Sequence, residues 1–288
     1  MHLALVTNQE YPNLLEGEVL PLQAFRKAGY EASPAVWNDS SVEWRQFGHI
    51  IIRCCWGYHR NVEEFYSWLD QLGVLGVTVH NAPEIVRWNS HKRYLLDLQS
   101  IGLPVPKTIL VSRSDARPLQ ETLGSVSCDQ VVIKPCYGAS SQGVMKVVRE
   151  EISEEAQAQY RKLLRSSDVL VQEFLPEIAQ GETSAVFFNN QFSHAVVKVP
   201  KTGEFRTNYD LGVTVHAVRL STQQKVTVER LYAQCEQDVL YARLDFVETA
   251  KGIRLMELEL IEPYLFFDFK EGAADDFVKA FEQRIELK

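Results

Sequence analysis

The sequence predicts a protein of the α/β and α+β class, with a parallel α/β unit in front, a mixed unit in the middle and an antiparallel sheet at the rear. Apolar strands alternate with amphipathic helices at the front, the middle third places strands beside a glycine- and serine-rich loop, and strand patterns dominate the last third. Alternation of strands and helices is typical of parallel sheets. We expect the three domains at residues 1–90, 91–180 and 181–288.

The front unit is built from short apolar strands separated by helices. The expected helices are Glu18–Ala28, ended by Gly29, and Val62–Leu72, ended by Gly73. Glycine adopts the left-handed conformation that commonly ends a helix. The expected strands are His2–Thr7, Glu31–Val36, His49–Cys54 and Val77–Asn81.

The middle and rear units contain longer strands with fewer helices. The expected helices are the segment from Asn89 to about Ser100, Glu151–Leu164, Gln223–Glu236 and Asp275–Glu286. The expected strands are Leu110–Val111, Gln130–Lys134, Val169–Phe174, Thr183–Phe188, Phe192–Val199, and the pair Leu240–Glu248 and Ile253–Ile261.

Composition narrows the class of protein. The 288 residues are 45% hydrophobic and 24% charged, and the formal net charge is −8, which argues against a nucleic-acid partner because such a surface needs a concentrated basic stripe. No apolar run approaches the roughly 20 residues of a membrane helix, and no secretory signal pattern is present. The five cysteines show no CxxC spacing, so we expect reduced thiols in a cytoplasmic protein with no membrane partner.

The expected C-terminal hairpin brings carboxylates together. If Ala250-Lys251-Gly252 forms a three-residue loop with Gly252 left-handed, Asp245 lies opposite Glu257 and Arg243 lies opposite Glu259. Carboxylates on one sheet face repel one another unless a cation lies between them, and Mg²⁺ prefers such oxygen ligands. The alternative is an exposed acidic face balanced by Arg243.

Three further segments offer groups suited to a nucleotide. Lys134 leaves a buried strand and enters a glycine–serine loop, which fits neither the P-loop pattern nor the GxGxxG pattern and could also be a flexible hairpin. The strand ending Gln172-Glu-Phe-Leu175-Pro176 exposes backbone groups that can pair with adenine, with Glu182 close by for ribose hydroxyls. The segment from Lys198 to Asn208 suits a transferred phosphoryl group, or a solvated loop.

The order and spacing of these segments resemble the ATP-grasp superfamily, in its glutathione synthetase and RimK-like branch. The matching positions are Lys92, Ile133-Lys134-Pro135, Gln172–Leu175, Glu182, Gly203–Asn208, Asp245 and Glu257-Leu-Glu259. Within that branch, three stretches resemble the subgroup containing D-cycloserine synthetase. These stretches are Arg53–Tyr58, Arg87–Asn89 and Leu255–Pro263. The resemblance covers the whole chain and implies a pre-ATP-grasp domain, a central lid domain and a C-terminal domain with the Mg²⁺ site.

The resemblance implies a role for each matching position. Asp245, Glu257 and Glu259 would hold Mg²⁺, or Mn²⁺ in its place, and Arg206 would stabilise the transferred phosphoryl group with help from Lys198 and Asn208. The positions expected to contact ATP are Lys92, Lys134, Ser140, Ser141, Gln172, Glu173, Phe174, Leu175 and Glu182. The family often has Asn where this chain has Glu259, and its loop is commonly richer in glycine than Ala139-Ser140-Ser141-Gln142.

These expectations define a function with two alternatives. The leading prediction is a ligase that joins a small carboxylate to an amine through an acyl-phosphate, either between two molecules or by closing a ring. A small-molecule kinase and a nucleotide-binding regulator without turnover remain the alternatives. We expect substrate specificity at Arg53, Trp56, Tyr58, His59 and Arg206. Arg53 either forks onto a carboxylate or forms a salt bridge at a strand end, and the interpretation of His59 is open in the same way. Homodimers are common in the family, so a homodimer is also expected.

Overall fold

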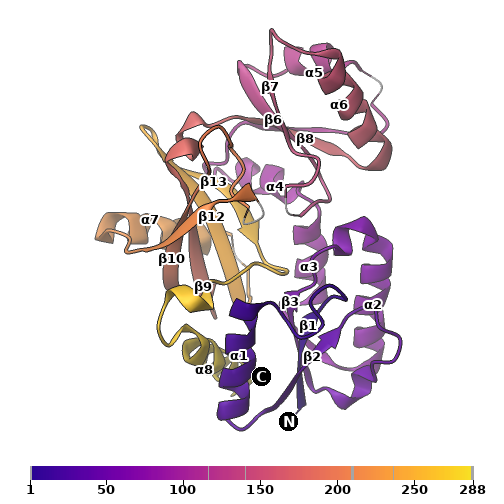
Figure 1. Cartoon of the computed structure of the whole chain (residues 1–288), viewed down its shortest axis with the longest axis vertical. Helices are drawn as coiled ribbons and strands as arrows, with labels where there is room; N and C mark the ends of the chain where they lie inside the picture. Colours follow the sequence, from indigo (N-terminus) through magenta and orange to yellow (C-terminus); the bar gives the residue numbers. More distant parts are fainter. Residues whose placement is uncertain (1, 116, 140, 209–210, 236, 287–288) are drawn as a thin grey trace.

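Three sheets follow one another along the long axis of the molecule (Figure 1). The computed structural model of the chain describes residues 2–115, 117–139, 141–208, 211–235 and 237–286, so Ser140, a predicted phosphate contact, lies outside the described residues. The front sheet has the order β2-β1-β3-β4, the central sheet β5-β8-β6-β7 and the rear sheet β11-β10-β9-β12-β13. The predicted fold class is confirmed.

The front sheet is parallel throughout, as the alternation of strands and helices predicts. Its strands are β1 (His2–Thr7), β2 (Glu31–Val36), β3 (His49–Cys54) and β4 (Thr78–His80). The helices are α1 (Val19–Lys27) and α2 (Val62–Leu75), with short 3-10 turns η1 (Glu16–Glu18), η2 (Trp44–Gln46) and η3 (Tyr58–Arg60). The prediction that α2 ends at Gly73 is wrong. The helix continues to Gly76, whose φ of 70° supplies the left-handed end that was expected three residues earlier.

The helix expected from Asn89 to Ser100 is two helices. They are α3 (Pro83–Ser90), which the sequence reading missed, and α4 (Tyr94–Ser100). The backbone is extended at His91 (φ −100°, ψ 115°), and Lys92 lies in this break with its N–H donating to the Cys136 carbonyl at 2.8 Å. The buried Asn89 side chain stabilises the end of α3, since it donates to the Leu258 carbonyl at 2.7 Å and accepts from the Leu260 N–H at 2.8 Å.

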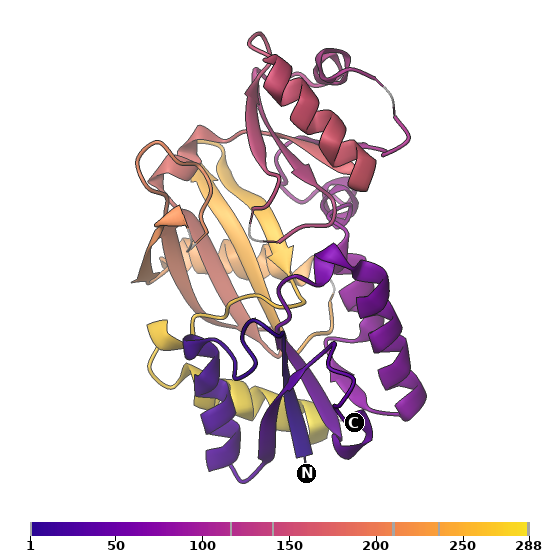
Figure 2. The same ribbon diagram turned by 45° about the vertical axis from the view of Figure 1, so that its right-hand side comes forward.

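The central sheet is antiparallel and carries helices on one side (Figure 2). Its strands are β5 (Thr108–Val111), β6 (Gln130–Pro135), β7 (Met145–Val148) and β8 (Val169–Glu173), and its helices are α5 (Leu119–Gly124) and α6 (Glu154–Ser166). The sequence reading missed the short α5. It began α6 three residues early, because Ser153 caps the helix by accepting from the Ala156 N–H at 3.1 Å.

The rear sheet is antiparallel throughout. Its strands are β9 (Glu182–Phe188), β10 (Gln191–Val199), β11 (Thr214–Val218), β12 (Tyr241–Thr249) and β13 (Gly252–Glu259). Its helices are α7 (Thr222–Ala233) and α8 (Ala273–Glu286), with 3-10 turns η4 (Pro176–Gln180) and η6 (Phe267–Phe269). The exposed edge strand β11 was missed. Figures 1 and 2 both place α8 against α1, so front and rear units share a core.

The β12–β13 hairpin reaches the predicted register by an unpredicted route. Asp245 lies opposite Glu257 and Arg243 opposite Glu259, as expected. The loop is shorter than predicted, because Thr249 pairs with Gly252 (φ 103°) and only two residues connect the strands. The register then shifts by one between Asp245 and Phe246, where Met256 is the extra residue. A one-residue shift moves side chains to the other face, so this β-bulge is what returns both glutamates to the face of Asp245.

Buried polar contacts fasten the front sheet to the rear sheet. Arg53 and Glu18 are fully buried and form two hydrogen bonds of 2.8 Å, while Arg53 also donates to the Pro263 carbonyl at 2.7 Å. The Tyr241 hydroxyl donates to the carbonyls of Ile52 and Ile261 at 2.8 and 2.9 Å. These bonds hold the segment after β13 against β3.

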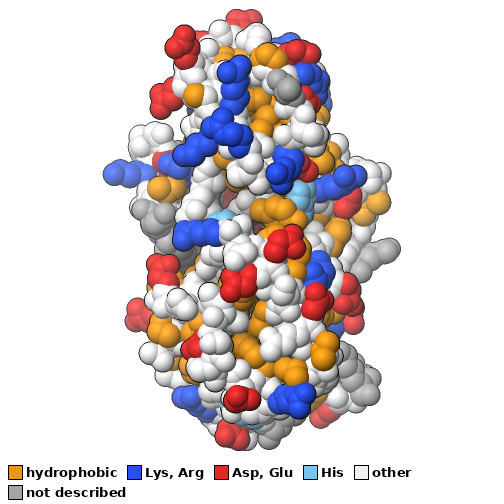
Figure 3. Space-filling view, turned by 90° about the vertical axis from the view of Figure 1, so that its right-hand side faces the viewer, with side chains coloured by type: hydrophobic (Ala, Val, Ile, Leu, Met, Phe, Trp, Pro, Cys, Tyr) orange, Lys and Arg blue, Asp and Glu red, His pale blue; other side chains and the backbone are white. Residues whose placement is uncertain are grey.

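The molecular surface mixes charges of both signs. On the face shown in Figure 3, Lys and Arg side chains gather over the upper part, where the central unit lies, and Asp and Glu side chains are more frequent below it. Among the described residues, no helix is both long and apolar enough to cross a membrane.

The Arg53–Glu18 pair yields a stability prediction. Arg53→Met leaves Glu18 charged in a buried site, so we expect the free energy of unfolding to fall by about 3–5 kcal/mol in urea titrations followed by tryptophan fluorescence. Lys27→Met is the control, because the Lys27–Asp275 pair is exposed and its loss should change stability by no more than about 0.5 kcal/mol. An Arg53→Met protein as stable as the control would contradict the buried pair.

Candidate functional site

A cleft of about 800 Å³ lies where the three sheets meet. The front unit contributes the turn after β3, the central unit contributes β6, β8 and the loop between β6 and β7, and the rear unit contributes β12, β13 and the segment after β10. Every described residue that the sequence predicted for the site lines this cleft, with the exception of Arg53. Segments far apart in the chain are therefore brought to one cavity.

Glu257 is the point at which cations from two elements converge. Lys92 Nζ, from the break between α3 and α4, lies 2.8 Å from Glu257 Oε1, and Lys134 Nζ, from β6, lies 3.2 Å from the same oxygen. Burial opposes ionisation of Glu257, but the two lysines outweigh it and hold the pKa of this carboxyl well below its usual range. Burial lowers the pKa of Lys134. The prediction that Lys134 and the rear-sheet acids share one cleft is confirmed by these contacts.

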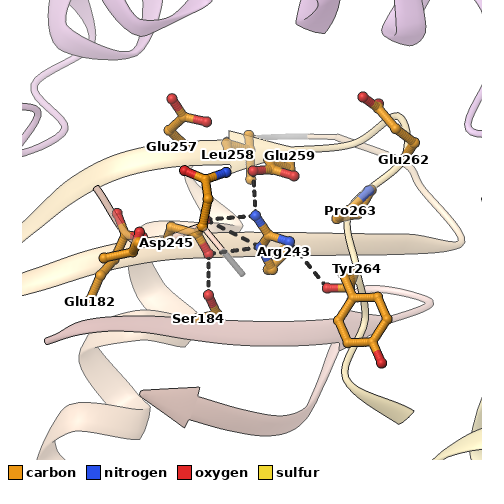
Figure 4. A network of polar contacts seen from close by, with 12 residues as sticks. Glu182, Ser184, Arg243, Asp245, Glu257, Leu258, Glu259, Glu262, Pro263 and Tyr264 are labelled. Atoms are coloured by element: carbon orange, nitrogen blue, oxygen red, sulfur yellow. Dashed lines mark hydrogen bonds and ion pairs between the residues drawn. The ribbon is translucent and has the colours of Figure 1, made fainter. Parts of the chain in front are cut away.

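Asp245 lies in a second group of charges on the same face (Figure 4). Arg243 donates to both Asp245 oxygens at 2.9–3.2 Å and also to Glu259, and Ser184 donates to Asp245 Oδ1 at 2.6 Å. Lys198 Nζ lies 3.3 Å from Asp245. Burial alone would raise the pKa of Asp245, but Arg243 and Lys198 lower it. Arg243 therefore neutralises part of the negative charge of this face, as the alternative interpretation of the hairpin proposed.

Two further carboxyls in the cleft are less well compensated. Burial raises the pKa of Glu259 to about 7, despite its contact with Arg243. Burial and the nearby Glu259 raise the pKa of Glu262 to about 8. The wall formed by β12, β13 and the following segment thus carries more negative charge than its own cations neutralise.

The donor set fits a magnesium ion that is shared with phosphate oxygens. Asp245, Glu257 and Glu259 offer hard oxygen ligands on one face, and the raised pKa of Glu259 shows a need for more positive charge. Among the described residues, no three Asp, Glu, His or Cys side chains stand close enough to hold a metal by themselves. Mg²⁺ commonly takes only one or two carboxylates and completes its shell with substrate phosphates and water, which suits this arrangement.

An apolar slot adjoins these charges. Leu175 and Ile178 pack with Val247, and Phe174, Phe205 and Met256 lie against them. Lys146 Nζ lies 4.7 Å from the centre of the Phe174 ring. The buried Gln172 side chain donates to Thr108 Oγ1 at 2.9 Å, and the Glu173 N–H donates to the Lys107 carbonyl at 2.8 Å. The slot is bounded by the strand end at which the sequence predicts adenine contacts.

The remaining predicted residues connect the central and rear units. Glu182 accepts from Thr207 at 2.7 Å and lies 2.6 Å from Lys198, so its expected ribose-binding carboxylate is already paired. Ser141 donates to Asn208 Oδ1, which joins the β6–β7 loop to the segment after β10.

Arg206 lines the cleft beside that segment. Its guanidinium is 2.6 Å from the Glu204 carboxylate. Hydrogen bonds from Arg206 lower the pKa of Glu204 to about 2, and they outweigh burial, which acts in the opposite direction. Arg206 is held by a carboxylate next to it rather than by the acids of the hairpin.

The front wall of the cleft corrects one prediction. Arg53 cannot bind a substrate carboxylate, because its guanidinium is fully buried on Glu18 and does not line the cleft. The alternative of a strand-end salt bridge is the one observed. Trp56, Tyr58 and His59 do line the cleft, and burial lowers the pKa of His59.

Several cleft residues were missed by the sequence reading. Met256 enters the slot only because of the bulge, which no local pattern announces. Tyr11 and Phe205 reach the cleft from loops, where the periodicity of the sequence does not predict the direction of a side chain. Glu262 could have been identified from the sequence, because it is a charged residue directly after the apolar end of the expected strand Ile253–Ile261.

Comparisons with known proteins agree with this geometry. The model of the prokaryotic glutathione synthetase ATP-grasp domain matches residues 97–268. The chain belongs to the ATP-grasp family. The model of the N-terminal domain of D-cycloserine synthetase DcsG matches residues 3–81.

The similarity to individual proteins extends over most of this ATP-grasp chain. The cycloserine biosynthesis protein DcsG of Streptomyces lavendulae is 28% identical over 280 residues, 92% of each chain. The crystal structure of D-cycloserine synthetase DcsG superposes with a TM-score of 0.86 at 26% identity, covering 99% of this chain and 100% of that one. D-alanine–D-alanine ligase from Bacillus anthracis shares the fold, with a TM-score of 0.69, 14% identity, and coverage of 99% and 96%. The chain is homologous to D-cycloserine synthetase and to ATP-grasp ligases.

The uncompensated carboxyls predict a pH-dependent stability. A carboxyl whose pKa is raised by folding binds more protons in the folded than in the unfolded protein between the two pKa values, so stability falls as pH rises through that interval. For Glu259 the interval runs from its ordinary 4.5 to about 7. We therefore expect the urea midpoint of the metal-free protein to fall between pH 5 and 7.

The Glu259→Gln variant should lack a large part of this decline, because an amide does not titrate. Glu248→Gln, at the exposed end of the same hairpin, should keep the wild-type slope. Equal slopes in both variants would show that Glu259 titrates at its ordinary pKa.

Proposed function

We propose that this chain is an ATP-dependent carboxylate–amine ligase that acts on a small amino-acid-like substrate through an acyl-phosphate. The observation that carries the proposal is the convergence of Lys92 and Lys134 on Glu257. Lysines from the break between α3 and α4 and from β6 face carboxylates of the rear sheet in a single cleft, which is the arrangement needed to hold a polyphosphate and a divalent cation between them.

The nucleotide is proposed to lie along the cleft from the apolar slot to Glu257. Adenine would enter the slot between Phe174 and Met256, and the backbone of Glu173 and Leu175 would contact its edge. The phosphates would then run toward the lysines. The residues proposed to contact ATP are Lys92, Lys134, Ser141, Gln172, Glu173, Phe174, Leu175 and Glu182, with Ser140 proposed from its place in the loop.

ATP-grasp ligases use ATP with Mg²⁺. Asp245, Glu257 and Glu259 are the residues that would hold Mg²⁺ here, and we propose that Mn²⁺ replaces it, because both take carboxylate and phosphate oxygens. The ion supplies charge neutralisation on the phosphoryl oxygens. With Glu257 engaged as a metal ligand, Lys92 and Lys134 would be able to contact the phosphates in place of that carboxylate.

Phosphoryl transfer is proposed to depend on positioning and charge. A carboxylate oxygen of the substrate attacks the γ-phosphorus, the bond to the bridging oxygen breaks, and ADP leaves. The proposed roles of Arg206 and Lys134 are to neutralise the transferred group, with Lys198 and Asn208 supporting this region of the cleft. An amine then attacks the acyl carbon, the carbon–oxygen bond breaks, phosphate leaves and the amine loses a proton to give an amide.

The substrate is proposed to sit between this region and the front wall. Trp56 and Tyr58 shape that wall, and Arg206 faces it across the cleft. A ring closure within one molecule is one form of the reaction, supported by the similarity to a cycloserine synthetase over 92% of the chain. Joining two molecules is the other, and the D-alanine–D-alanine ligase shares the fold.

Three broader features belong to the proposal. Domains at residues 1–90, 91–180 and 181–288 would let the central unit close over the nucleotide and keep water from the acyl-phosphate. The five cysteines are free thiols, which supports a cytoplasmic location. A homodimer is proposed by analogy with the family alone.

An oxygen-transfer experiment tests the reaction. The protein is incubated with ATP, Mg²⁺ and D- and L-amino acids labelled with ¹⁸O in their carboxylates, and the released phosphate is analysed by mass spectrometry. A ligase moves one carboxylate oxygen into phosphate, so phosphate with a single ¹⁸O is expected. The mass of the product distinguishes the two forms: one substrate molecule minus water would indicate ring closure, and two molecules minus water would indicate joining.

The same experiment separates the alternatives. A kinase forms ADP and a stable phosphorylated product without releasing phosphate, and a regulator binds ATP without forming ADP. Lys134→Met is the negative control, since removal of the lysine should abolish turnover while the fold is retained. Released phosphate without ¹⁸O would contradict an acyl-phosphate.

A further inference from the structure

Glu262 is a half-buried carboxylate without an ion pair to any described residue, beside rear-sheet acids that are all paired. Glu182, Asp245, Glu257 and Glu259 each contact a lysine or arginine. The half-buried Glu262 side chain lines the same cleft, yet among the described residues no other side chain donates to its carboxylate or forms an ion pair with it. Figure 4 shows it directed away from Arg243, with no contact drawn to it. A half-buried carboxylate is stabilised by a cation, and at Glu262 Lys92 and Arg243 act only from a distance, without an ion-pair contact among the described residues.

The backbone around Glu262 is fixed on both sides. Trp56 Nε1 donates to the Glu262 carbonyl at 3.1 Å. The preceding Ile261 carbonyl accepts from the Tyr241 hydroxyl at 2.9 Å, and the following Pro263 carbonyl accepts from Arg53 at 2.7 Å. Three consecutive carbonyls thus accept hydrogen bonds from side chains, two of them from the buried Arg53 and Tyr241. The carboxylate therefore projects from a rigid segment, which is the support that a recognition group requires.

The wall beside Glu262 suits a cation and does not suit an anion. The Trp56 carbonyl accepts a hydrogen bond from Asn8 Nδ2 at 2.7 Å, which holds the residue in place. The Trp56 ring packs edge-on against the Tyr11 ring, with 5.8 Å between the ring centres. Both rings line the cleft. Aromatic faces attract ammonium groups, and Arg53, the cation expected on this wall, is buried on Glu18.

We propose that Glu262, beside Trp56, determines specificity by binding a protonated amino group of the substrate. The inference rests on the proposed function, since it assigns a substrate class to the same cleft. The ligase would accept zwitterionic amino acids, with the ammonium held at Glu262 and the carboxylate directed toward Arg206 and the phosphates. Carboxylic acids of the same shape without an amino group would bind weakly, because they leave Glu262 without a cation.

Equilibrium binding tests this inference without requiring turnover. Protein loaded with Mg²⁺ and the non-hydrolysable analogue AMP-PNP is titrated by calorimetry with D- and L-alanine, serine and glutamate. Each is compared with the matching acid that lacks the amino group, namely propionate, 3-hydroxypropionate and glutarate. Wild-type protein should prefer at least one amino acid over its matched acid by about tenfold or more, as expected for a charge-assisted hydrogen bond.

The isosteric Glu262→Gln variant removes the charge and keeps the shape. It should lose the preference for the amino acid, by about tenfold or more in affinity, while AMP-PNP affinity stays unchanged. Glu16→Gln, the same chemical change on an exposed residue outside the cleft, should keep the wild-type preference. Unchanged AMP-PNP affinity also shows that the variant is folded.

The outcomes separate this inference from the proposed function. Equal binding of amino acids and matched acids by the wild type, no binding of any amino acid, or a preference that survives in Glu262→Gln overturns the role of Glu262. A change in Mg²⁺ affinity with the preference intact also overturns it, because Glu262 would then act on the metal. Retained discrimination without ADP release in turnover assays would instead overturn the ligase and leave the ammonium site standing.

Discussion

The site depends on keeping buried carboxylates ionised. Glu257 stays charged only because Lys92 and Lys134 lie on the same oxygen, and Asp245 stays charged because Arg243 and Lys198 face it. A carboxylate without such partners would take up a proton, as the raised pKa values of Glu259 and Glu262 indicate. Because Lys92 and Lys134 come from the central unit, the charge balance of the rear sheet also links these two units across the cleft.

This balance explains how one cleft can serve a metal and a polyphosphate. Lysines that neutralise Glu257 in the free protein are the groups that a phosphate chain would attract, and in the proposed function the carboxylate they leave would become a ligand for the divalent cation. Little reorganisation of charge is needed, since each positive group exchanges one anion for another. The buried Arg53–Glu18 pair takes no part in this exchange and belongs to the rigid front wall that positions Trp56 and Glu262.

Much of the fold and site could be predicted from the sequence, because the signals are local or periodic. The alternation along β12 and β13 predicts which acids share a face, and a lysine at the end of a buried strand before a glycine–serine loop predicts Lys134. The true loop has two residues rather than three, and only the bulge at Met256 gives the predicted register. A bulge depends on packing between sheets, so no local sequence pattern predicts it.

Other features depend on contacts between distant segments. The break before Lys92 arises because Asn89 bonds to the backbone of the rear sheet, and an apolar pattern alone predicts a continuous helix. Arg53 was misassigned for a related reason, since a strand-end arginine gives no sign of whether it faces a cleft or a buried glutamate. The role of Glu262 became visible only when its neighbours proved to be paired.

Manganese binding tests most directly whether Glu257 is the point at which metal and nucleotide are held together. Electron paramagnetic resonance of free Mn²⁺ measures its binding to the protein in the presence of AMP-PNP. Wild-type protein and Glu248→Gln should bind Mn²⁺ with equal affinity, and Glu257→Gln should bind it at least about tenfold more weakly. Unchanged Mn²⁺ affinity in Glu257→Gln would contradict the account, because the acid between the two lysines would then have no part in holding the cation.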